Sequence, residues 1–423
     1  MKKYLILISL VLAAGYAQAQ SLDDIRKLVI LSQYDKARPE IDKYMADEKN
    51  AAKPEGWYYK AFVYNSLGRV ATKPVTESKS LYQGAFDAIK KYAELDPKAP
   101  LTTEEKNSTV FNVYYGFFDL GSKTYGESNF TESYDLFKKA LDVHDYIYNK
   151  NLTGYNDTKF SAHDTNVVWN LAVLANELKK KDEALVYYKQ IADADLSEEK
   201  YVGAYDDLVI KYKREKNEEL FNKYVTAAKK HYPVDKPYWE AQEIEFAING
   251  LENEALFTKY DELTTRFPNS YMVFYNYGLE LDRFIYSADA KGKDIAAYKK
   301  KMAELFKRAI ELNSTIEANL QLGNLYYNSS FDYLDEVGKI KGTKPEDVKK
   351  KNELMALSKE TVAKAIPYCE EAVRQLGLLT EYKTGEKVNY KLGLEILVNA
   401  YTKAGNTAKA AEYSKKKAEV EKL

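Results

Sequence analysis

The sequence contains very few of the residues that form cross-links and bind structural metals. Its 423 residues include a single cysteine, Cys369, and three histidines. One cysteine cannot form an intramolecular disulfide, and a structural zinc site needs about four Cys or His ligands. The sequence therefore predicts a protein without internal disulfides and without a bound metal.

An excess of charge of either sign is also absent. The chain carries 63 Lys and Arg residues against 64 Asp and Glu residues, a formal net charge of −1. Proteins that coat nucleic acid need a net basic face to neutralise phosphates, so this balance argues against a nucleic-acid partner. With 45% hydrophobic residues, the chain has enough apolar side chains to build a folded core.

Long hydrophobic runs are missing except at the N-terminus. Two lysines are followed by an apolar run at 4–14, and Ala17 and Ala19 form the small-x-small pattern that signal peptidase reads. The run is shorter than the roughly 18 residues that span a bilayer, although a membrane anchor is the alternative interpretation. We expect a signal peptide at 1–19. The protein is then exported to the periplasm or cell envelope of a Gram-negative bacterium and is not an integral membrane protein.

Motifs that carry catalysis are not found either. The sequence has no Gly-rich phosphate loop, no nucleophile elbow and no His-Glu-x-x-His helix. His144 and His163 are each followed by an aspartate but have no third partner at ligand spacing, so we expect surface or loop histidines. Cys369 falls at an apolar position of a predicted helix, where a buried thiol acts as a small hydrophobe. These observations predict a protein that is not an enzyme and that needs no cofactor.

What the sequence does contain is helical periodicity in pairs of segments. Apolar residues recur three and four apart at 165–175 and again at 182–191, with a short polar connection between them. This pattern predicts two antiparallel helices that touch through the small residues Ala172 and Ala184. The same arrangement recurs along the chain, where Leu120-Gly121 precedes Phe137, Tyr277-Gly278 precedes Phe306, and Leu322-Gly323 precedes Ala365 and Ala372.

At these residues the chain resembles the tetratricopeptide repeat (TPR) proteins, whose unit is about 34 residues in two antiparallel helices. The resemblance implies an all-α fold, a right-handed α-solenoid of about eight stacked helix hairpins. Each hairpin buries one apolar face against the next, so the core is continuous. Aromatic side chains fill the space between hairpins, which accounts for most of the 38 tyrosines.

The repeat pattern also divides the chain. The predicted segments are a signal peptide at 1–19, N-terminal repeats at 20–148, an irregular connection at 149–164, central repeats at 165–327, an insertion at 328–360 and C-terminal repeats at 361–423. Such insertions are either loops that carry binding or helix extensions with solvated tips. For the longest we expect residues 330–345 to lie outside the stack.

Two kinds of helix-start signal accompany the repeats. Pro39 and Pro367 are expected in the first turn of a second helix, where proline costs little. Ser21, with Asp24 three residues on, resembles a capping box at the start of the first helix.

The resemblance implies that a protein or peptide partner binds along the concave face formed by the first helix of each unit. Asparagine amides at this face can hold a peptide backbone, and aromatic rings supply contact area, although Trp169 and Tyr275 can equally pack between helices. The predicted binding residues are Trp169, Asn170, Asn176, Tyr275, Asn276, Arg283, Gln321, Asn324 and Tyr327. The alternative is a glycan-binding protein similar to the SusD-like proteins, which also use TPR helices and exposed aromatics. Those proteins are typically lipid-anchored through an N-terminal cysteine, and this chain has none there.

Overall fold

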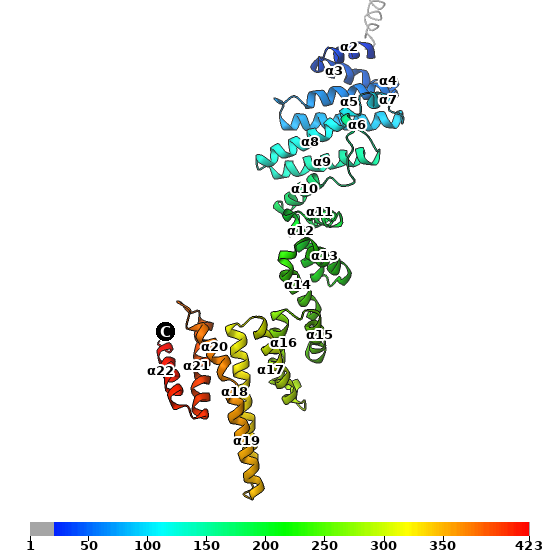
Figure 1. Cartoon of the computed structure of the whole chain (residues 1–423). Helices are drawn as coiled ribbons and strands as arrows, with labels where there is room; N and C mark the ends of the chain where they lie inside the picture. Colours follow the sequence, from blue (N-terminus) through cyan, green and yellow to red (C-terminus); the bar gives the residue numbers. More distant parts are fainter. Residues whose placement is uncertain (1–20, 423) are drawn as a thin grey trace, which may run out of the picture. The chain divides into compact units, whose positions relative to one another are not determined.

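The computed structural model describes residues 21–422, and the predicted signal peptide lies outside them. Every regular element among these residues is a helix, as the resemblance implies. The chain divides into two units, one ending at Trp239 and one beginning at Glu240 (Figure 1). The border falls inside helix α14 (Lys236–Ile248), within the stretch 165–327 that the repeat pattern treats as one block. Each unit is described by itself.

Unit 1 is a series of antiparallel helix hairpins. Its helices are α2 (Leu22–Ile30), α3 (Tyr34–Met45), α4 (Glu48–Ala51), α5 (Pro54–Gly68), α6 (Val75–Leu95), α7 (Pro100–Glu104), α8 (Ser108–Gly126), α9 (Phe130–Asn149), α10 (Thr165–Glu177), α11 (Lys181–Asp193), α12 (Val202–Arg214) and α13 (Glu218–His231). The hairpins α2–α3, α5–α6, α8–α9, α10–α11 and α12–α13 follow one another, and each packs on the next. The first helices α2, α5 and α8 also contact one another in turn, so they share one face of the stack.

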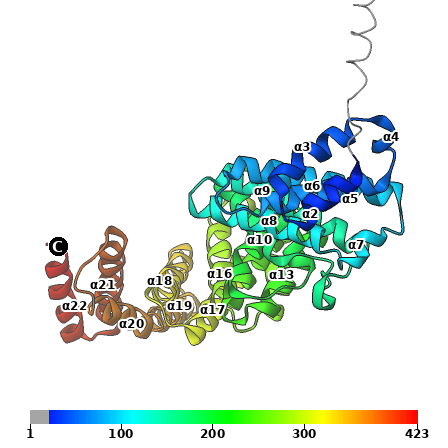
Figure 2. The same cartoon turned by 90° about the horizontal axis from the view of Figure 1, so that it is seen from above.

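Unit 2 follows the same plan. Its helices are α15 (Asn253–Arg266), α16 (Tyr271–Ile285), α17 (Ile295–Leu312), α18 (Ile316–Lys339), α19 (Pro345–Ala363), α20 (Ile366–Leu376), α21 (Thr384–Ala404) and α22 (Thr407–Val420). The hairpins α16–α17, α18–α20 and α21–α22 pack in this order. Helices α21 and α22 lie side by side in both views of the chain (Figures 1 and 2).

The predicted close crossings between paired helices are present. A Cβ added at Gly278 would lie 2.5 Å from the ring of Phe306, and one added at Gly323 would lie 2.4 Å from Sγ of Cys369. Atoms this close clash, so only glycine allows these helix pairs to approach as they do. Cys369 is fully buried, and burial raises the pKa of its thiol to about 12, which confirms its prediction as a core residue.

The structure confirms two of the three predictions about helix starts and contradicts the third. The Asp24 amide donates to Ser21 Oγ at 3.3 Å, and Pro367 occupies the first turn of α20. Pro39 was predicted in a first turn, but this is wrong because it lies in the middle of α3. The chain reverses directly after α2 through the left-handed residue Ser32 (φ 55°), so α3 begins at Tyr34, five residues before the proline.

The insertion at 328–360 is helical over most of its length. Helix α18 continues to Lys339 and α19 returns from Pro345, so only a five-residue tip is not helical. The expectation that residues 330–345 all lie outside the stack is wrong at Ser330, which is fully buried. Ser358 Oγ donates to the Ser330 carbonyl at 2.8 Å, and this bond joins the two helices where they leave the stack.

The connection between α9 and α10 corrects the expectation for His144. His144 is buried rather than at the surface, and its Nδ1 lies 3.0 Å from Asp145 Oδ1. Phe160, from the connection, stacks on the imidazole with ring centroids 5.1 Å apart and also contacts Tyr114 at 4.7 Å. An aromatic residue in a loop thus covers the histidine, whereas His163 is exposed as predicted.

Candidate binding site

The three predicted binding residues of unit 1 lie on the first helix α10. Trp169 is half-buried, with its ring edge-on to Tyr201 at 5.2 Å, and Asn170 is also half-buried. Asn176 is exposed and lines a hollow of about 440 Å³ together with charged residues of α11 and α12. The Trp169 ring therefore packs against Tyr201, while the Asn176 side chain is accessible to a ligand.

In unit 2, Tyr275, Asn276 and Arg283 lie on α16. Tyr275 stacks on Tyr271 with centroids 5.3 Å apart, and burial raises the pKa of Tyr275 to about 12. Arg283 is exposed but donates to Glu280 at 2.7 Å, and Asn276 is half-buried. The ring of Tyr275 is therefore largely occupied by its neighbours.

The remaining three residues lie on α18. Tyr327 accepts a hydrogen bond from Asn399 Nδ2 at 3.0 Å, and its ring lies edge-on to Phe331 at 5.1 Å. Asn324 Oδ1 accepts from Asn328 at 3.3 Å, and Gln321 is half-buried. Tyr327 and Asn324 thus make contacts inside the unit, and their partner-binding role stays a prediction.

A pocket that the sequence did not predict lies on the first-helix face of unit 1. It has a volume of about 400 Å³ and is formed by α2, α5 and α7. Its lining is mainly aromatic and aliphatic, with three charged residues: Val29, Ile30, Tyr58, Tyr59, Phe62, Leu101, Arg26, Glu104 and Glu105. A concave apolar site with a few convergent polar groups is the usual form of a ligand-binding pocket.

Local sequence explains how the pocket is built. Tyr58 and Phe62 are four residues apart, so they share one face of α5, with ring centroids 6.3 Å apart. Helix α7 begins at Pro100 and is held in place because the Leu101 amide donates to the hydroxyl of Tyr92 at 2.9 Å. The aromatic floor comes from α5 and the acidic rim from the end of α7.

The charged side chains give the pocket an excess of acidic groups. Arg26 donates to Asp23 at 2.8 Å and to Glu55, while its Nε is buried without a hydrogen-bond partner among the described residues. Burial raises the pKa of Glu105 to about 7, although its carboxyl accepts a hydrogen bond from the Thr109 amide at 3.3 Å. Because Asp23 and Glu55 already pair with Arg26, the lining residues Glu104 and the partly ionised Glu105 are left to face a positive group of a ligand.

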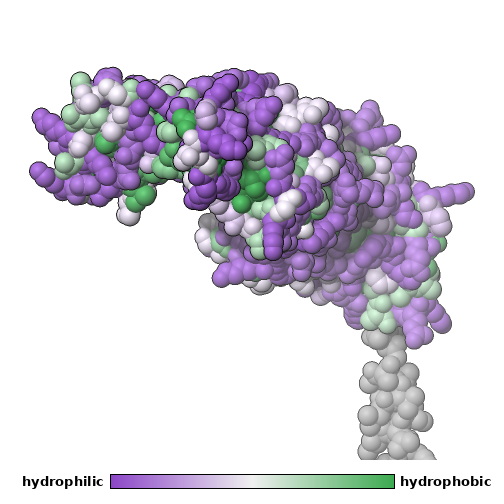
Figure 3. Space-filling model, turned by 90° about the horizontal axis from the view of Figure 1, so that it is seen from below, coloured by the Kyte–Doolittle hydropathy of each residue, from purple (hydrophilic) through white to green (hydrophobic). Residues whose placement is uncertain are grey.

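The rim of the pocket also exposes apolar surface. Ile30 is 80% exposed and the adjacent Leu31 is 64% exposed, at the end of α2. The face of the molecule seen in Figure 3 is mainly hydrophilic, with small separate hydrophobic areas. Exposed apolar side chains beside an aromatic hollow are what a docking surface presents before its partner binds.

Solved structures similar to this chain include TPR proteins. A TPR repeats protein from Bacteroides fragilis is 16% identical, with 67% of this chain and 97% of that chain covered and a TM-score of 0.27. The TPR domain of P58(IPK) is 13% identical, with 90% and 98% covered and a TM-score of 0.22. YrrB, described as a TPR protein with an unusual peptide-binding site, is 15% identical, with 64% and 92% covered and a TM-score of 0.16. No protein-family model matches the chain, and no curated protein matches it.

The paired antiparallel helices, which approach closely at glycine residues, identify the fold. The chain has a TPR-like fold. Within residues 21–422 of this TPR-like chain, no helix is long and apolar enough to cross a membrane. The same residues contain no group of three His, Cys, Asp or Glu side chains placed to hold a metal ion.

The aromatic part of the pocket was predictable from the sequence, because it has a visible compositional signal. Residues 57–62 include Trp57, Tyr58, Tyr59 and Phe62 on one helix, which is more aromatic surface than a single buried stripe can use. Because tyrosines were assigned to packing between hairpins, the half-buried rings of α5 were not recognised as a site. The contribution of α7 could not be read from the sequence, since that short helix has no repeat signature.

Proposed function

We propose that this chain is an exported, non-enzymatic scaffold that binds a peptide segment of a protein partner. The α2–α5–α7 pocket is its principal site. The proposed export to the Gram-negative cell envelope is supported by the N-terminal sequence pattern at 1–19. The observation that carries the binding proposal is the pocket itself, an aromatic floor with an acidic rim and the exposed Ile30 at its edge.

The side chains that line the pocket determine which kind of peptide segment binds there. An aliphatic or aromatic side chain fills the space over Tyr58, Tyr59 and Phe62, and burying it contributes about 1.5–3 kcal/mol. A neighbouring lysine or arginine of the partner meets Glu104 and Glu105. Binding of a cation favours the ionised form of Glu105 and so lowers its raised pKa.

Glycan binding is the less well supported alternative, because stacking on a sugar needs an open aromatic face. Trp57 is half-buried and donates its Nε1–H to the Ala51 carbonyl at 2.9 Å, Trp169 is half-buried, and Trp239 is buried. The tyrosines of the pocket line a hollow of about 400 Å³ whose lining is mainly apolar.

The test compares two labelled peptides of about twelve residues that differ only in charge, with a central phenylalanine flanked by lysines or by glutamates. Fluorescence anisotropy is measured on the chain without residues 1–19, and a set of oligosaccharides serves as competitor. We expect the basic peptide to bind more tightly by about tenfold or more. Equal binding of both peptides, or displacement by an oligosaccharide, would contradict the proposal.

Matched variants locate the site. Ile30→Ser and Glu104→Lys change exposed side chains of the pocket, and both should weaken binding of the basic peptide. Val186→Ser is the control, because Val186 is 56% exposed on the second helix α11, away from the pocket lining. A loss of binding in the control, or none in the two pocket variants, would place the site elsewhere.

A further inference from the structure

Another hollow of unit 1 lies between the hairpin α10–α11 and the next helix, α12. It has a volume of about 440 Å³ and is the hollow that Asn176 lines. The first half of α11 and the second half of α12 form its two long sides, so it lies between a second helix and the first helix of the next hairpin. Its lining contains as many cationic side chains as carboxylates, and its overall charge is therefore balanced.

Not all of these charges are paired. Lys211 Nζ donates to Glu215 at 2.6 Å, which neutralises both groups. Asp207 and Arg214, in contrast, make no side-chain hydrogen bond or ion pair with any other residue in the range 21–422. Burial is the main cause of a raised pKa at Asp207, and the nearby Lys181 only partly offsets it. The hollow therefore holds a carboxylate and a guanidinium that lack partners.

These two charged groups lie at opposite ends of an apolar stretch. Asp207 and Arg214 are seven residues apart on α12, which is nearly two turns, so they share one face with their Cα atoms about 10.5 Å apart. Ile210 lies between them on α12, and Leu185 and Tyr188 of α11 extend the apolar part of the lining. Along the hollow, a carboxylate is thus followed by apolar surface and then by a guanidinium.

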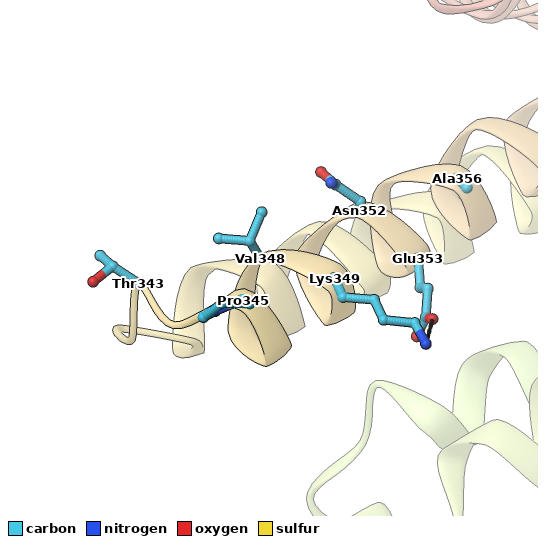
Figure 4. Close-up of a pocket in the computed structure, with 7 residues that line it drawn as sticks. All are labelled: Thr343, Pro345, Val348, Lys349, Asn352, Glu353 and Ala356. Atoms are coloured by element: carbon cyan, nitrogen blue, oxygen red, sulfur yellow. Dashed lines mark ion pairs between the residues drawn. The ribbon is translucent and has the colours of Figure 1, made fainter.

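The hollow on α19 provides a contrast within the same chain. It is larger, about 730 Å³, but it is lined only by the turn before α19 and one side of that helix (Figure 4). Its single carboxylate, Glu353, lies 3.9 Å from its single cation, Lys349 (Figure 4). The charges on α19 are therefore paired with each other, whereas the hollow beside α12 keeps one unpaired charge of each sign.

We propose that the hollow between α11 and α12 binds a short free peptide of two or three residues by its two charged ends. The terminal ammonium group of the peptide donates to Asp207, and its terminal carboxylate accepts from Arg214, whose guanidinium can form two parallel hydrogen bonds with a carboxylate. The peptide side chains pack on Leu185 and Ile210. This site is separate from the α2–α5–α7 pocket and does not rest on the function proposed for that pocket.

The spacing of the two charges determines the length of the ligand. An extended peptide spans about 3.3–3.6 Å per residue, so two or three residues bridge most of the distance between Asp207 and Arg214. The long Arg214 side chain covers the remainder. A free amino acid carries both charges on one carbon and reaches only one end of the hollow. An internal segment of a protein has neither terminal charge, so it cannot satisfy either group in this way.

Isothermal titration calorimetry tests the proposal on the chain without residues 1–19, with leucyl-leucine and leucyl-glycyl-leucine as probes. We expect at least one of them to bind with a Kd between about 10 µM and 1 mM. Its N-acetylated form, its C-terminal amide and free leucine should each bind at least about tenfold more weakly, because each loses one of the two end contacts. Absence of binding by both free peptides, or equal binding by the blocked forms, would overturn the proposal.

Two variants assign the ends of the peptide. Asp207→Asn should weaken binding of the free peptide about tenfold and abolish the preference over the N-acetylated form, while the preference over the amide remains. Arg214→Gln should have the opposite pattern. Both residues are exposed, so far-ultraviolet circular dichroism should not change. Asp119→Asn is the matched control, because Asp119 is exposed on α8 outside the lining.

The pattern across the variants decides the outcome. A variant at Asp207 that weakens the free and the N-acetylated peptide equally would show that the ammonium group does not bind there. Lys181→Ala provides a further check, since it removes the cation nearest to Asp207 that competes with the ligand. It should leave binding of the free peptide unchanged or stronger. Weaker binding by Lys181→Ala would show that the orientation of the peptide in the hollow is wrong.

Discussion

The α8–α9 hairpin of unit 1 and the arm of unit 2, formed by residues 332–357 of α18 and α19, are both antiparallel helix pairs, but their apolar residues differ in environment. In the first, Phe117, Phe137 and Val143 are at most 2% exposed, because α6 packs on α8 and α10 packs on α9. In the arm, Val348 and Met355 are nearly half exposed. Stacking on both sides, rather than pairing within the hairpin, is what buries a hairpin of this fold.

The largest expected difference is in the cost of truncating an aromatic or apolar side chain. Phe137→Ala should lower the free energy of unfolding of its part of the chain by about 3–5 kcal/mol, because it leaves a cavity between α8 and α9. Met355→Ala in the arm should cost less than about 0.5 kcal/mol. Urea titration followed by circular dichroism measures both, and similar costs would show that Met355 is covered in solution.

The glycine crossing of unit 2 should respond next most strongly. Gly323→Ala brings a methyl group within 2.4 Å of the Cys369 Sγ position, so we expect a loss of about 1–3 kcal/mol. Cys369→Ala removes the sulfur that the new methyl group meets. The double variant should therefore lose less than the sum of the two single variants, and simple additivity would show that the helices move apart instead.

The half-buried carboxyl of Glu105 in unit 1 should make stability depend on pH. Burial raises the pKa of Glu105 from 4.5 to about 7, so the folded chain holds this proton at a pH where the unfolded chain has released it. Its contribution to the free energy of unfolding is therefore complete below about pH 4.5 and is lost as the pH rises toward 7.

Glu105→Gln removes this dependence and keeps an acceptor for the Thr109 amide. We expect the variant to be more stable than the wild type at pH 8, by up to about 3 kcal/mol, and equal to it at pH 4. Thermal melts at the two pH values measure the difference. A stabilisation that is the same at both would assign the effect to packing rather than to the proton.

The smallest effect is expected from removing the arm. Replacing residues 333–356 with a short Gly-Ser linker keeps Ser330 and Ser358, whose hydrogen bond closes the base. Loop closure changes by about 0.6 kcal/mol per doubling of length, so melting of unit 2 should shift little. A large drop in melting temperature would show that the arm supports the stack.

The repeats were predictable from the sequence because their information is local. Glycine and alanine at the crossings, as at Gly278 and Ala172, mark each helix pair, and their apolar spacing gives the helical period. Helix starts were less predictable, since α3 begins where Ser32 permits a left-handed turn and not where Pro39 would prefer. The sequence at 328–360 predicts a loop insertion rather than two paired helices, because Gly338, Gly342 and Pro345 are residue types common in loops.

The candidate site was harder to predict because it depends on segments outside the repeat. The pocket joins α2 and α5 with α7, a five-residue helix fixed by a single hydrogen bond to Tyr92. The burial of His144 likewise depends on Phe160, which arrives from an irregular connection. Contacts of this kind form only in the folded chain and leave no periodic pattern in the sequence.

The packed connection at 150–164 has a consequence for limited proteolysis. It is long and mostly non-helical, so it resembles a linker that proteases cut first. Yet Phe160 lies among the rings of Phe111 and Tyr114, and Asn107 Nδ2 donates to the Thr153 carbonyl at 2.9 Å, which restrains its backbone. Trypsin should instead cut first after Lys341 in the exposed arm tip, because the Lys344–Pro345 bond resists trypsin. The nicked chain then stays together through α18 and α19, and its first visible fragments do not mark a domain border.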